Sequence, residues 1–331
     1  MAIKLHSVQT LAQKATRADV YYRSKNPDRL PNPRWNFAPP IPPYSFQGST
    51  SGYTSGSSNV IDKFPFASDA NATDVGDLTQ ARGLSSAASS SVSGYSSGGG
   101  SYSNIIDKFP FSADGNATDV GDLTEGKSYA SGGQSSSTNG YVTSGVNSSA
   151  VRINVIEKFP YSSDANATDV GDLTQVRGYG RPAGQSSTTS GYTSGGYFSG
   201  FQNTIDKFPF ASNANATDVG DLTQGRGGLT GQSSTASGYS SGGNSPGVVN
   251  IIDKFPFASD ANATDVGDLT VARYGPAGQS STASGYSSGG ILPTGPTQYN
   301  IIDKFPFSSN ANATDVGDLT VARNGAAGQQ V

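Results

Sequence analysis

Short hydrophobic runs alternate along this chain with segments rich in Gly, Ser, Asn and Asp. The runs contain Thr, Tyr, Ile and Phe, which favour pleated structure, whereas Gly, Asn and Asp mark the turns between them. One stretch of the chain therefore predicts four successive strands, at residues 185–190, 192–194, 203–210 and 221–226. The pattern indicates β-structure built from short strands and tight turns.

This pattern recurs six times, and the lysine of the block Ile-Asp-Lys-Phe-Pro-Phe marks each unit. It stands at Lys63, Lys108, Lys158, Lys207, Lys254 and Lys304, which gives spacings of 45, 50, 49, 47 and 50 residues. A period of about 40–50 residues with four short strands is typical of propeller blades. A solenoid of stacked coils is the alternative, but it tolerates variable spacing less easily. We therefore predict an all-β fold, a six-bladed β-propeller.

The two ends of the repeat array are in the same phase. The array begins at Gln47 and stops at residues 325–329, which correspond to the start of a first strand. We expect residues 46–331 to close into a ring between their two ends, with the seam in or beside one inner strand, because closure removes exposed sheet edges.

Three features of each unit resemble the kelch repeat: a Tyr before a Gly-Gly doublet, an aromatic third strand, and a basic residue before the next first strand. That basic residue is Arg82, Lys127, Arg177, Arg226, Arg273 or Arg323. The resemblance implies a kelch-like propeller. The sequence departs from the kelch pattern at the fourth strand, where Trp is missing and a leucine stands instead: Leu78, Leu123, Leu173, Leu222, Leu269 or Leu319.

The composition agrees with a propeller and excludes several other classes of protein. Only 34% of the 331 residues are hydrophobic, Gly accounts for 43, and aromatic residues reach 10%. Gly and Ser are poor helix formers, which argues against a helical globule, and the aromatic content argues against a disordered linker. The chain has no Cys and a single His, His6, which excludes a disulfide framework and argues against zinc sites and Ser/His/Asp catalysis.

Charge divides the chain into two parts. Residues 1–45 carry seven Lys and Arg against two Asp, a net of +5, and the remainder carries −9, which together give −4. We predict an N-terminal anchoring arm over residues 1–45, with a helix at 7–23 and an extended, Pro-rich stretch at 26–43. Six arm residues are its candidate contacts: Lys14, Arg17, Arg23, Arg29, Arg34 and Trp35. A plain linker is the alternative role of this arm.

The partner of the arm is expected to be a protein. Seven dispersed basic residues are a weak footprint for nucleic acid, so no nucleic-acid partner is predicted. No run of 18 apolar residues occurs, so no membrane insertion is predicted either.

Each unit contains an Asp/Asn-rich loop that is similar to a calcium-binding loop. In residues 69–77, side-chain oxygens fall at positions 1, 3, 5, 6 and 9. However, Gly falls at position 8, no bidentate Glu follows, and Asn213 and Asn310 replace the first Asp in two units. We therefore predict a turn in which these side chains bond their own backbone and no cofactor, with calcium as the alternative.

Two sets of loops differ clearly between the units, whereas the other loops are almost identical. In a four-stranded blade, the loops between strands two and three and those leading from strand four to the next blade lie on one face, and both sets differ here. Variable loops on a rigid scaffold usually carry binding specificity. The candidate partner-binding residues are the aromatic ones in these loops: Tyr102, Tyr179, Tyr197, Phe198, Phe201 and Tyr299. Local packing is the other interpretation of these side chains.

The blocks Asp-Lys-Phe-Pro-Phe and Asp-Val-Gly-Asp-Leu-Thr resemble repeats in virion proteins of marine and cyanobacterial tailed phages. The resemblance implies a non-catalytic structural protein of the virion, attached to capsid or tail proteins by its arm and presenting the propeller for assembly or for binding host-surface glycans. Several copies on one particle would raise avidity. The alternatives are a soluble glycan-binding lectin and a carbohydrate-active enzyme. The enzyme is the weaker of the two, because the Asp residues recur six-fold whereas an active site is a unique constellation.

Overall fold

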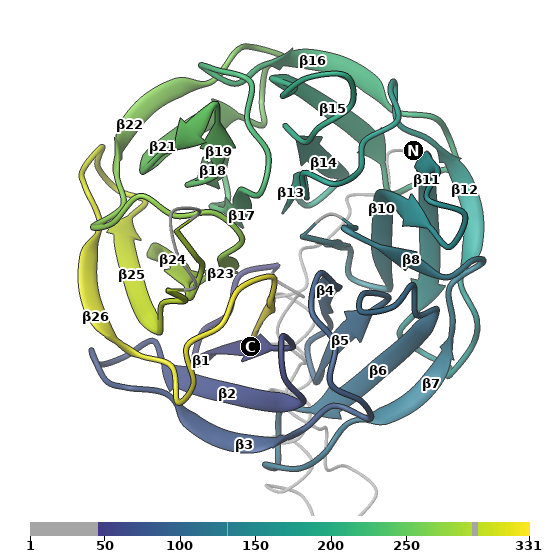
Figure 1. Ribbon diagram of the computed structural model, residues 1–331, viewed down its shortest axis with the longest axis horizontal. Coiled ribbons are helices and arrows are strands. Elements are labelled where there is room, and N and C mark those ends of the chain that lie inside the picture. Colours follow the sequence, from purple (N-terminus) through teal and green to yellow (C-terminus); the bar gives the residue numbers. More distant parts are fainter. Residues whose placement is uncertain (1–45, 131, 293–296) are drawn as a thin grey trace, which may run out of the picture. The chain divides into compact units, whose positions relative to one another are not determined.

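The computed structural model describes residues 46–130, 132–292 and 297–331. These residues form an all-β, six-bladed propeller in which the blades surround a central axis (Figure 1). Each blade is an antiparallel sheet whose strands are arranged one after another from the axis to the rim. The fold predicted from the repeat period is therefore confirmed.

The strands form four concentric layers. The innermost strands are β4 (Ser86–Ser89), β9 (Gln134–Ser135), β13 (Ala183–Ser186), β17 (Thr230–Ser233), β23 (Ala277–Ser280) and β27 (Ala327–Gln330). The second layer contains β1 (Ser51–Ser55), β5 (Ser93–Ser97), β10 (Asn139–Asn147), β14 (Ser190–Ser194), β18 (Ser237–Ser241) and β24 (Ser284–Ser288). The third contains β2 (Val60–Pro65), β6 (Ile105–Pro110), β11 (Arg152–Pro160), β15 (Thr204–Pro209), β21 (Ile251–Pro256) and β25 (Ile301–Pro306).

The rim is formed by β3 (Thr73–Asp77), β7 (Thr118–Asp122), β12 (Thr168–Asp172), β16 (Thr217–Asp221), β22 (Thr264–Asp268) and β26 (Thr314–Asp318). Three further short strands, β8 (Lys127–Ser128), β19 (Asn244–Ser245) and β20 (Gly247–Val248), belong to loops. We number the blades in chain order, so that blade 1 contains β1 to β3 and blade 4 contains β13 to β16.

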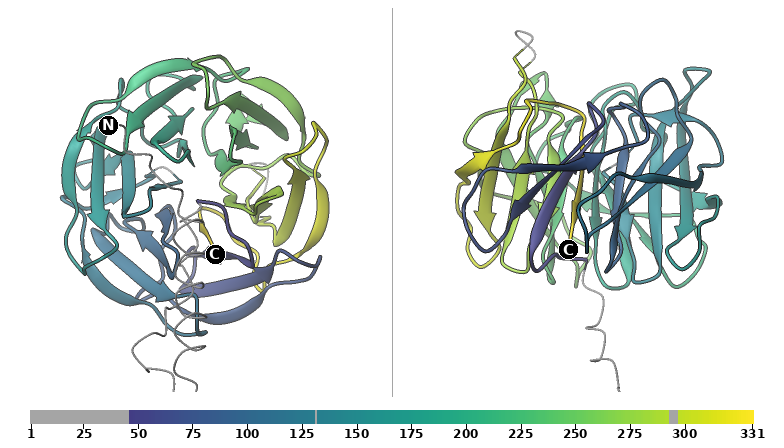
Figure 2. Two further views of the ribbon diagram at one scale, coloured as in Figure 1. Left: turned by 180° about the vertical axis from the view of Figure 1, so that it is seen from behind. Right: turned by 90° about the horizontal axis from the view of Figure 1, so that it is seen from below.

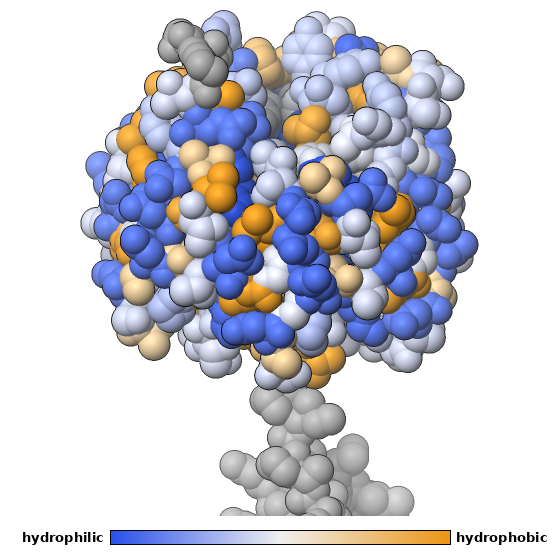
Figure 3. Space-filling view, turned by 60° about the horizontal axis from the view of Figure 1, so that its bottom comes forward, coloured by the Kyte–Doolittle hydropathy of each residue, from blue (hydrophilic) through white to orange (hydrophobic). Residues whose placement is uncertain are grey.

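Two strand predictions need correction. The fourth strand of blade 4 is Thr217–Asp221 and not residues 221–226, and the first strand is Ala183–Ser186 and not 185–190. The motif Thr-Asp-Val-Gly-Asp has the composition of a turn, yet it pairs with β15 as an exposed rim strand. A rim strand has no neighbour outside it, so it needs few apolar side chains. Viewed from the side of blade 1, hydrophobic residues on the rim are scattered among hydrophilic ones (Figure 3).

The ring is closed by the last strand of the chain. β27 pairs antiparallel with β1, so the C-terminal segment supplies the innermost strand of blade 1. The backbone N–H groups of Ser49, Thr50 and Ser51 all donate to the carbonyl oxygen of Val331, at 2.9, 2.7 and 3.0 Å. The in-phase ends of the repeat array thus meet in one sheet, as the sequence predicted.

A buried carboxylate joins each pair of neighbouring blades. Asp206, in β15, accepts hydrogen bonds from the backbone N–H and the hydroxyl of Thr174, at 3.1 and 2.6 Å, and an ion pair from Arg177 at 2.8 Å. Thr174 and Arg177 lie between β12 of blade 3 and β13 of blade 4, so Asp206 fixes the linker between the two blades. The basic residues singled out in the repeats all make this contact: Arg82–Asp107, Lys127–Glu157, Arg177–Asp206, Arg226–Asp253, Arg273–Asp303 and Arg323–Asp62.

Aromatic rings fill the spaces between blades. Tyr192 of blade 4 stacks on Phe257 of blade 5 at 4.8 Å and lies 5.5 Å from Phe255. Equivalent contacts join the other blades, from Tyr53 with Phe109 to Tyr286 with Phe64. Burial of these tyrosines raises their pKa, for Tyr95 to about 12. The aromatic core explains how a chain with few aliphatic residues forms a packed interior.

The Gly of each Gly-Tyr pair is required by a ring in its own blade. A Cβ at Gly191 would lie 2.3 Å from Cζ of Phe208, which covers the glycine from the neighbouring strand β15. The same contact recurs at Gly52, Gly94, Gly140, Gly238 and Gly285. Glycine is therefore needed in the Gly-Tyr pair because the phenylalanine ring occupies the space that a Cβ atom would take.

We predict that Gly191→Ala lowers the free energy of unfolding by about 1–3 kcal/mol, because the added methyl group overpacks the ring of Phe208. Denaturant unfolding would measure the change. Gly200→Ala is the matched control, since nothing lies within 4 Å of a Cβ at Gly200. Equal stability of the two variants would contradict the packing role assigned to Gly191.

We also predict that Arg177→Lys and Asp206→Glu are each destabilising, and that the double variant recovers at least about 1 kcal/mol relative to the sum of the single changes. The reason is that blade 3 already contains the matched pair Lys127–Glu157 at this position. A double-mutant cycle by denaturant unfolding would measure the coupling. Strict additivity would show that the ion pair does not determine the choice of partner.

Candidate functional site

The antiparallel blades give the propeller two distinct faces. We call the face that carries the loops between strands one and two and between strands three and four the constant face; in blade 4 these loops are residues 187–189 and 210–216. The variable face carries the loops between strands two and three, such as residues 195–203, and the linkers between blades. In the side view of Figure 2, loops of the variable face rise at the top and the C-terminus lies toward the bottom.

The loops between strands two and three differ in height around the variable face. In blade 3 the strands themselves extend into a hairpin, because β10 and β11 continue their pairing to Val146 and Arg152. Blade 4 forms a bridge between Tyr197 and Phe201, and blade 5 contains the hairpin of β19 and β20. Blade 1 has only residues 56–59 between its strands β1 and β2. The variable face is therefore asymmetric although the ring is built from near-identical units.

Aromatic side chains gather around one arginine on the variable face at blades 3 and 4. The guanidinium carbon of Arg152 lies 5.0 Å from the ring centroid of Tyr179, 5.7 Å from Tyr197 and 5.9 Å from Phe198. Tyr129 lies 5.4 Å from Tyr179, and Phe201 lies 5.3 Å from Tyr197. We call these six residues the Arg152 cluster: Tyr129, Arg152, Tyr179, Tyr197, Phe198 and Phe201.

The cluster contains four of the six candidate residues named from the sequence, namely Tyr179, Tyr197, Phe198 and Phe201. The other two, Tyr102 in blade 2 and Tyr299 in blade 6, are half-buried and lie in other loops. Sequence reasoning missed Tyr129 and Arg152. A signal for Arg152 was present, because it is the only charged residue in the six variable segments that the sequence predicts between strands two and three, in its case residues 146–153.

Two tyrosines of the cluster adopt a strained backbone conformation. The residue two positions after each buried basic residue has a left-handed φ in all six linkers. In three linkers this residue is glycine, with φ of 66° at Gly228, 72° at Gly275 and 66° at Gly325. In the others it is Leu84, Tyr129 and Tyr179, with φ of 60°, 58° and 56°.

A side chain in this conformation costs about 1–2 kcal/mol relative to glycine. The fold accepts glycine at these positions in three linkers, so folding alone does not require tyrosine there. Strained residues of this kind cluster at functional sites, where the side chain serves a purpose other than stability. The conformation of Tyr129 and Tyr179 therefore favours a binding role over plain packing for this pair.

The buried basic residues also support the loops of the variable face. Arg177 Nη1 donates to the carbonyl oxygens of Gly195 and Thr204, at 2.8 and 3.0 Å. These two residues stand at the two ends of the loop that carries Tyr197, Phe198 and Phe201. The ion pair that joins blades 3 and 4 thus fixes the base of a loop of the Arg152 cluster.

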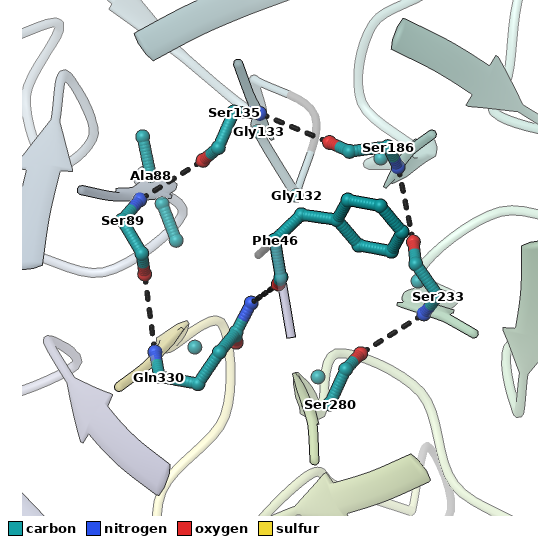
Figure 4. A pocket seen from close by; sticks show the side chains of 15 residues that line it. Phe46, Ala88, Ser89, Gly132, Gly133, Ser135, Ser186, Ser233, Ser280 and Gln330 are labelled. Carbon is teal, nitrogen blue, oxygen red and sulfur yellow. Dashed lines mark hydrogen bonds between the residues drawn. The ribbon is translucent and has the colours of Figure 1, made fainter. Parts of the chain in front are cut away.

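The chain enters the propeller at the opposite face. Phe46 lies inside the central axis, among the ends of the innermost strands (Figure 4). Serine hydroxyls there link successive blades, for example Ser135 Oγ accepting from the N–H of Ser89 at 2.9 Å. In blade 1, Gln330 replaces the serine, and its Nε2 donates to the carbonyl oxygen of Phe46 at 2.7 Å. Phe46 therefore enters the axis from the constant face.

The variable-face end of the axis is filled by Arg181. Its Nη2 donates to the carbonyl oxygens of Ser85 and Ala326, at 3.2 and 3.1 Å, across the ring from blade 4. Burial without a carboxylate lowers the pKa of Arg181 to about 10. The axial cavity measures about 40 Å³, room for about three water molecules. A sugar or a peptide does not fit there.

The oxygen side chains of the Asp/Asn loop point to separate partners. Asp69 Oδ1 pairs with Lys304 at 2.9 Å, Asn71 Oδ1 accepts from the N–H of Asp318, and Asp74 Oδ1 accepts from the N–H of Gly76. Within the described parts of the chain, no three His, Cys, Asp or Glu side chains group as metal ligands would. The Asp74 contact is the local turn predicted from the sequence, while the Asp69 and Asn71 contacts join blade 1 to blade 6.

The predicted anchoring arm lies outside the described residues, and so do Lys14, Arg17, Arg23, Arg29, Arg34 and Trp35. Its anchoring role therefore stays a prediction from the sequence.

We predict that Tyr179→Gly leaves the free energy of unfolding unchanged or raises it by up to about 1 kcal/mol. Relief of the left-handed backbone offsets the loss of the ring contacts with Arg152 and Tyr129. Thermal unfolding of the variant beside Tyr192→Gly, which removes a buried ring, would measure the difference. A loss above about 2 kcal/mol at Tyr179 would show that its ring is structural.

No protein-family model matches this chain, and no curated protein matches it. None of the residues that the structure describes forms a helix long and apolar enough to cross a membrane.

Proposed function

We propose that this protein is a non-catalytic attachment protein that holds on to a larger assembly through residues 1–45 and binds a partner with its variable face. The observation that carries the proposal is the difference between the two faces of the ring. Differences between six near-identical blades gather on one face, and the chain enters the propeller from the other. Phe46 and the loops that differ between blades therefore lie at opposite faces of the ring.

The Arg152 cluster is the part of the variable face best suited to binding. Tyr179 and Phe198 keep 43% and 41% of their surface exposed, although both are large apolar rings. Exposed aromatic residues on a rigid scaffold are typical of recognition sites. The left-handed φ of Tyr129 and Tyr179 supports the same assignment, because the fold uses glycine at this position elsewhere.

The assembly that we propose is a virion. This part of the proposal depends on the resemblance of the repeat blocks to virion proteins of tailed phages and on the basic arm, whose net charge of +5 contrasts with −9 for the rest of the chain. Capsid or tail proteins are then the partners of the arm, and host-surface glycans are candidates for the variable face. The resemblance to kelch repeats supports a propeller used for binding.

A soluble glycan-binding lectin is the second candidate, and the exposed aromatic residues of the Arg152 cluster favour it equally well. The two functions differ in the arm, because a lectin does not need to attach to a particle. The geometry of the variable face is compatible with both a virion attachment protein and a soluble lectin.

The arm decides between these two functions. Full-length protein would be incubated with a lysate of infected source cells and recovered, and its partners identified by mass. Capsid or tail proteins are expected with the wild type and absent from a variant in which Lys14, Arg17, Arg23, Arg29 and Arg34 become Gln.

The control is Phe198→Ser, which changes the variable face and leaves the arm intact. It should recover the same virion proteins as the wild type but lose binding to host cells. Failure of the wild type to recover any capsid or tail protein would contradict the virion role and favour the lectin.

A further inference from the structure

We propose that the Arg152 cluster binds acidic carbohydrate, with Arg152 taking the carboxylate of a uronic acid residue and the exposed rings of Tyr179 and Phe198 packing on the sugar. This inference rests on the proposed function, for which it names the ligand class. It follows from the bonding state of Arg152, the exposure of the rings and the charge of the surrounding surface.

Arg152 is a half-buried cation without an anionic partner. The ion pairs among the described residues do not include it. Its Nε is buried and makes no hydrogen bond. In contrast, the six basic residues that recur in the repeats are all paired with carboxylates, and Arg181, which has no carboxylate, donates to the carbonyl oxygens of Ser85 and Ala326. Arg152 is thus the arginine of the variable face whose two Nη groups are left for a ligand, since neither is among the buried atoms and neither makes a hydrogen bond within the described residues.

The rings around Arg152 leave its donors available to a planar acceptor. Tyr179, Tyr197 and Phe198 lie within 6 Å of the guanidinium and interact with it through their π-systems. Such contacts use the charge of the guanidinium but none of its N–H groups. A stacked guanidinium retains the fork of donors that binds a carboxylate through two parallel hydrogen bonds.

The exposed rings explain why the carboxylate should belong to a sugar. Phe198 has no polar atom in its side chain, so a purely ionic ligand would gain nothing from it. The C–H face of a pyranose ring is apolar and buries hydrophobic surface when it packs on an aromatic ring. Tyr179 and Phe198 are both within reach of Arg152, so one acidic sugar can contact the cation and a ring together.

The charge of the surface argues against a nucleic acid as the anion. Residues 46–331 carry a net of −9, the loops between strands two and three contain no charged residue, and Arg152 is the first residue of β11, at the end of such a loop. A polyphosphate backbone needs several neutralising Lys or Arg side chains, whereas a single uronic acid needs one. The acidic residue of the loops around Arg152 is Glu125, in the linker that carries Tyr129, and its Oε2 accepts a hydrogen bond from Asn147 Nδ2 at 3.1 Å.

The cluster is also fixed in position before a ligand arrives. Tyr179 is held by its left-handed backbone, by Tyr129 at 5.4 Å and by a hydrogen bond from its hydroxyl to the carbonyl oxygen of Ala150 at 3.4 Å. Rigid aromatic contacts lose little conformational entropy on binding. The strain at Tyr179 therefore has a use in this proposal, since it presents the ring beside Arg152.

Isothermal titration of the full-length protein would test the proposal with three probes: oligomers of galacturonate, glucuronate and mannuronate. At least one should bind, and its methyl ester, which has the same rings without the charge, should bind at least about tenfold more weakly. If none of the three oligomers binds, or if the methyl ester binds equally well, the proposal is wrong.

Variants assign the binding to the cluster. Arg152→Met keeps the length of the side chain and removes the charge, and Phe198→Ala removes a ring; each should weaken binding at least about tenfold. Val92→Ala, at an exposed residue of the constant face, is the control and should bind as the wild type does. Unchanged melting temperatures would show that the variants are folded. Unchanged affinity of Arg152→Met would overturn the proposal.

The outcomes separate this inference from the proposed function. Loss of host-cell binding by Phe198→Ser, together with no binding of any uronate oligomer, would overturn the carbohydrate proposal and keep the binding role of the variable face. If no uronate oligomer binds and the variable face captures a protein instead, the carbohydrate proposal is likewise overturned and the binding role is kept. Normal host-cell binding by both Arg152→Met and Phe198→Ser would instead remove the cluster from the proposed function and this inference with it.

Discussion

The buried ion pair between each linker and the following blade is the contact on which the rest of this propeller depends. Asp206 and its counterparts accept from a threonine at the end of one blade and from a basic residue of the linker. Arg177 in turn donates to carbonyl oxygens at the base of a loop on the variable face. A buried charge without its partner is costly, so the pair fixes the position of each blade relative to the next. Blade 3 supports this interpretation, because Lys127 and Glu157 have changed together and the pair is preserved.

Small residues and aromatic rings fill the remaining space in complementary ways. The glycine of each Gly-Tyr pair leaves room for a phenylalanine of its own blade, and the tyrosine beside it packs on the rings of the next blade. Near the axis, where the strands converge, serine hydroxyls link neighbouring blades. A second polar contact follows the same ring: Gln134 donates to the carbonyl and hydroxyl oxygens of blade 4. Blade 2 has Ala88 in place of this glutamine, and the hydroxyl-bearing residue that it would meet is replaced by Val142. Polar and apolar partners thus change in pairs.

The six-fold scaffold leaves one face free to vary. The loops of the constant face take part in contacts between blades, such as Asn71 with Asp318 and Asp69 with Lys304, so a change there would affect the ring. In blades 1, 4 and 5 the loops between strands two and three are held at their bases by the buried residues Arg323, Arg177 and Arg226, and they are otherwise free to differ. Blades 3 and 4 use this freedom to bring Arg152 and its aromatic neighbours together. Two of these tyrosines occupy positions where three other linkers have glycine, so folding alone does not require a tyrosine there.

The sequence by itself determined the number of blades, the closure in phase, the second and third strands and the face on which differences gather. These properties follow from local pattern and from repetition, which the chain displays directly. Only the tertiary structure decided that the Thr-Asp-Val-Gly-Asp motif is a rim strand, since its side chains have the composition of a turn and its pairing partner lies in another strand. Four of the six residues of the Arg152 cluster could be named from the sequence as aromatic residues in variable loops. Their contacts with Arg152 and Tyr129 could not be predicted. These contacts depend on how the ring brings linkers and hairpins of neighbouring blades together, and no local sequence pattern encodes the distances between them.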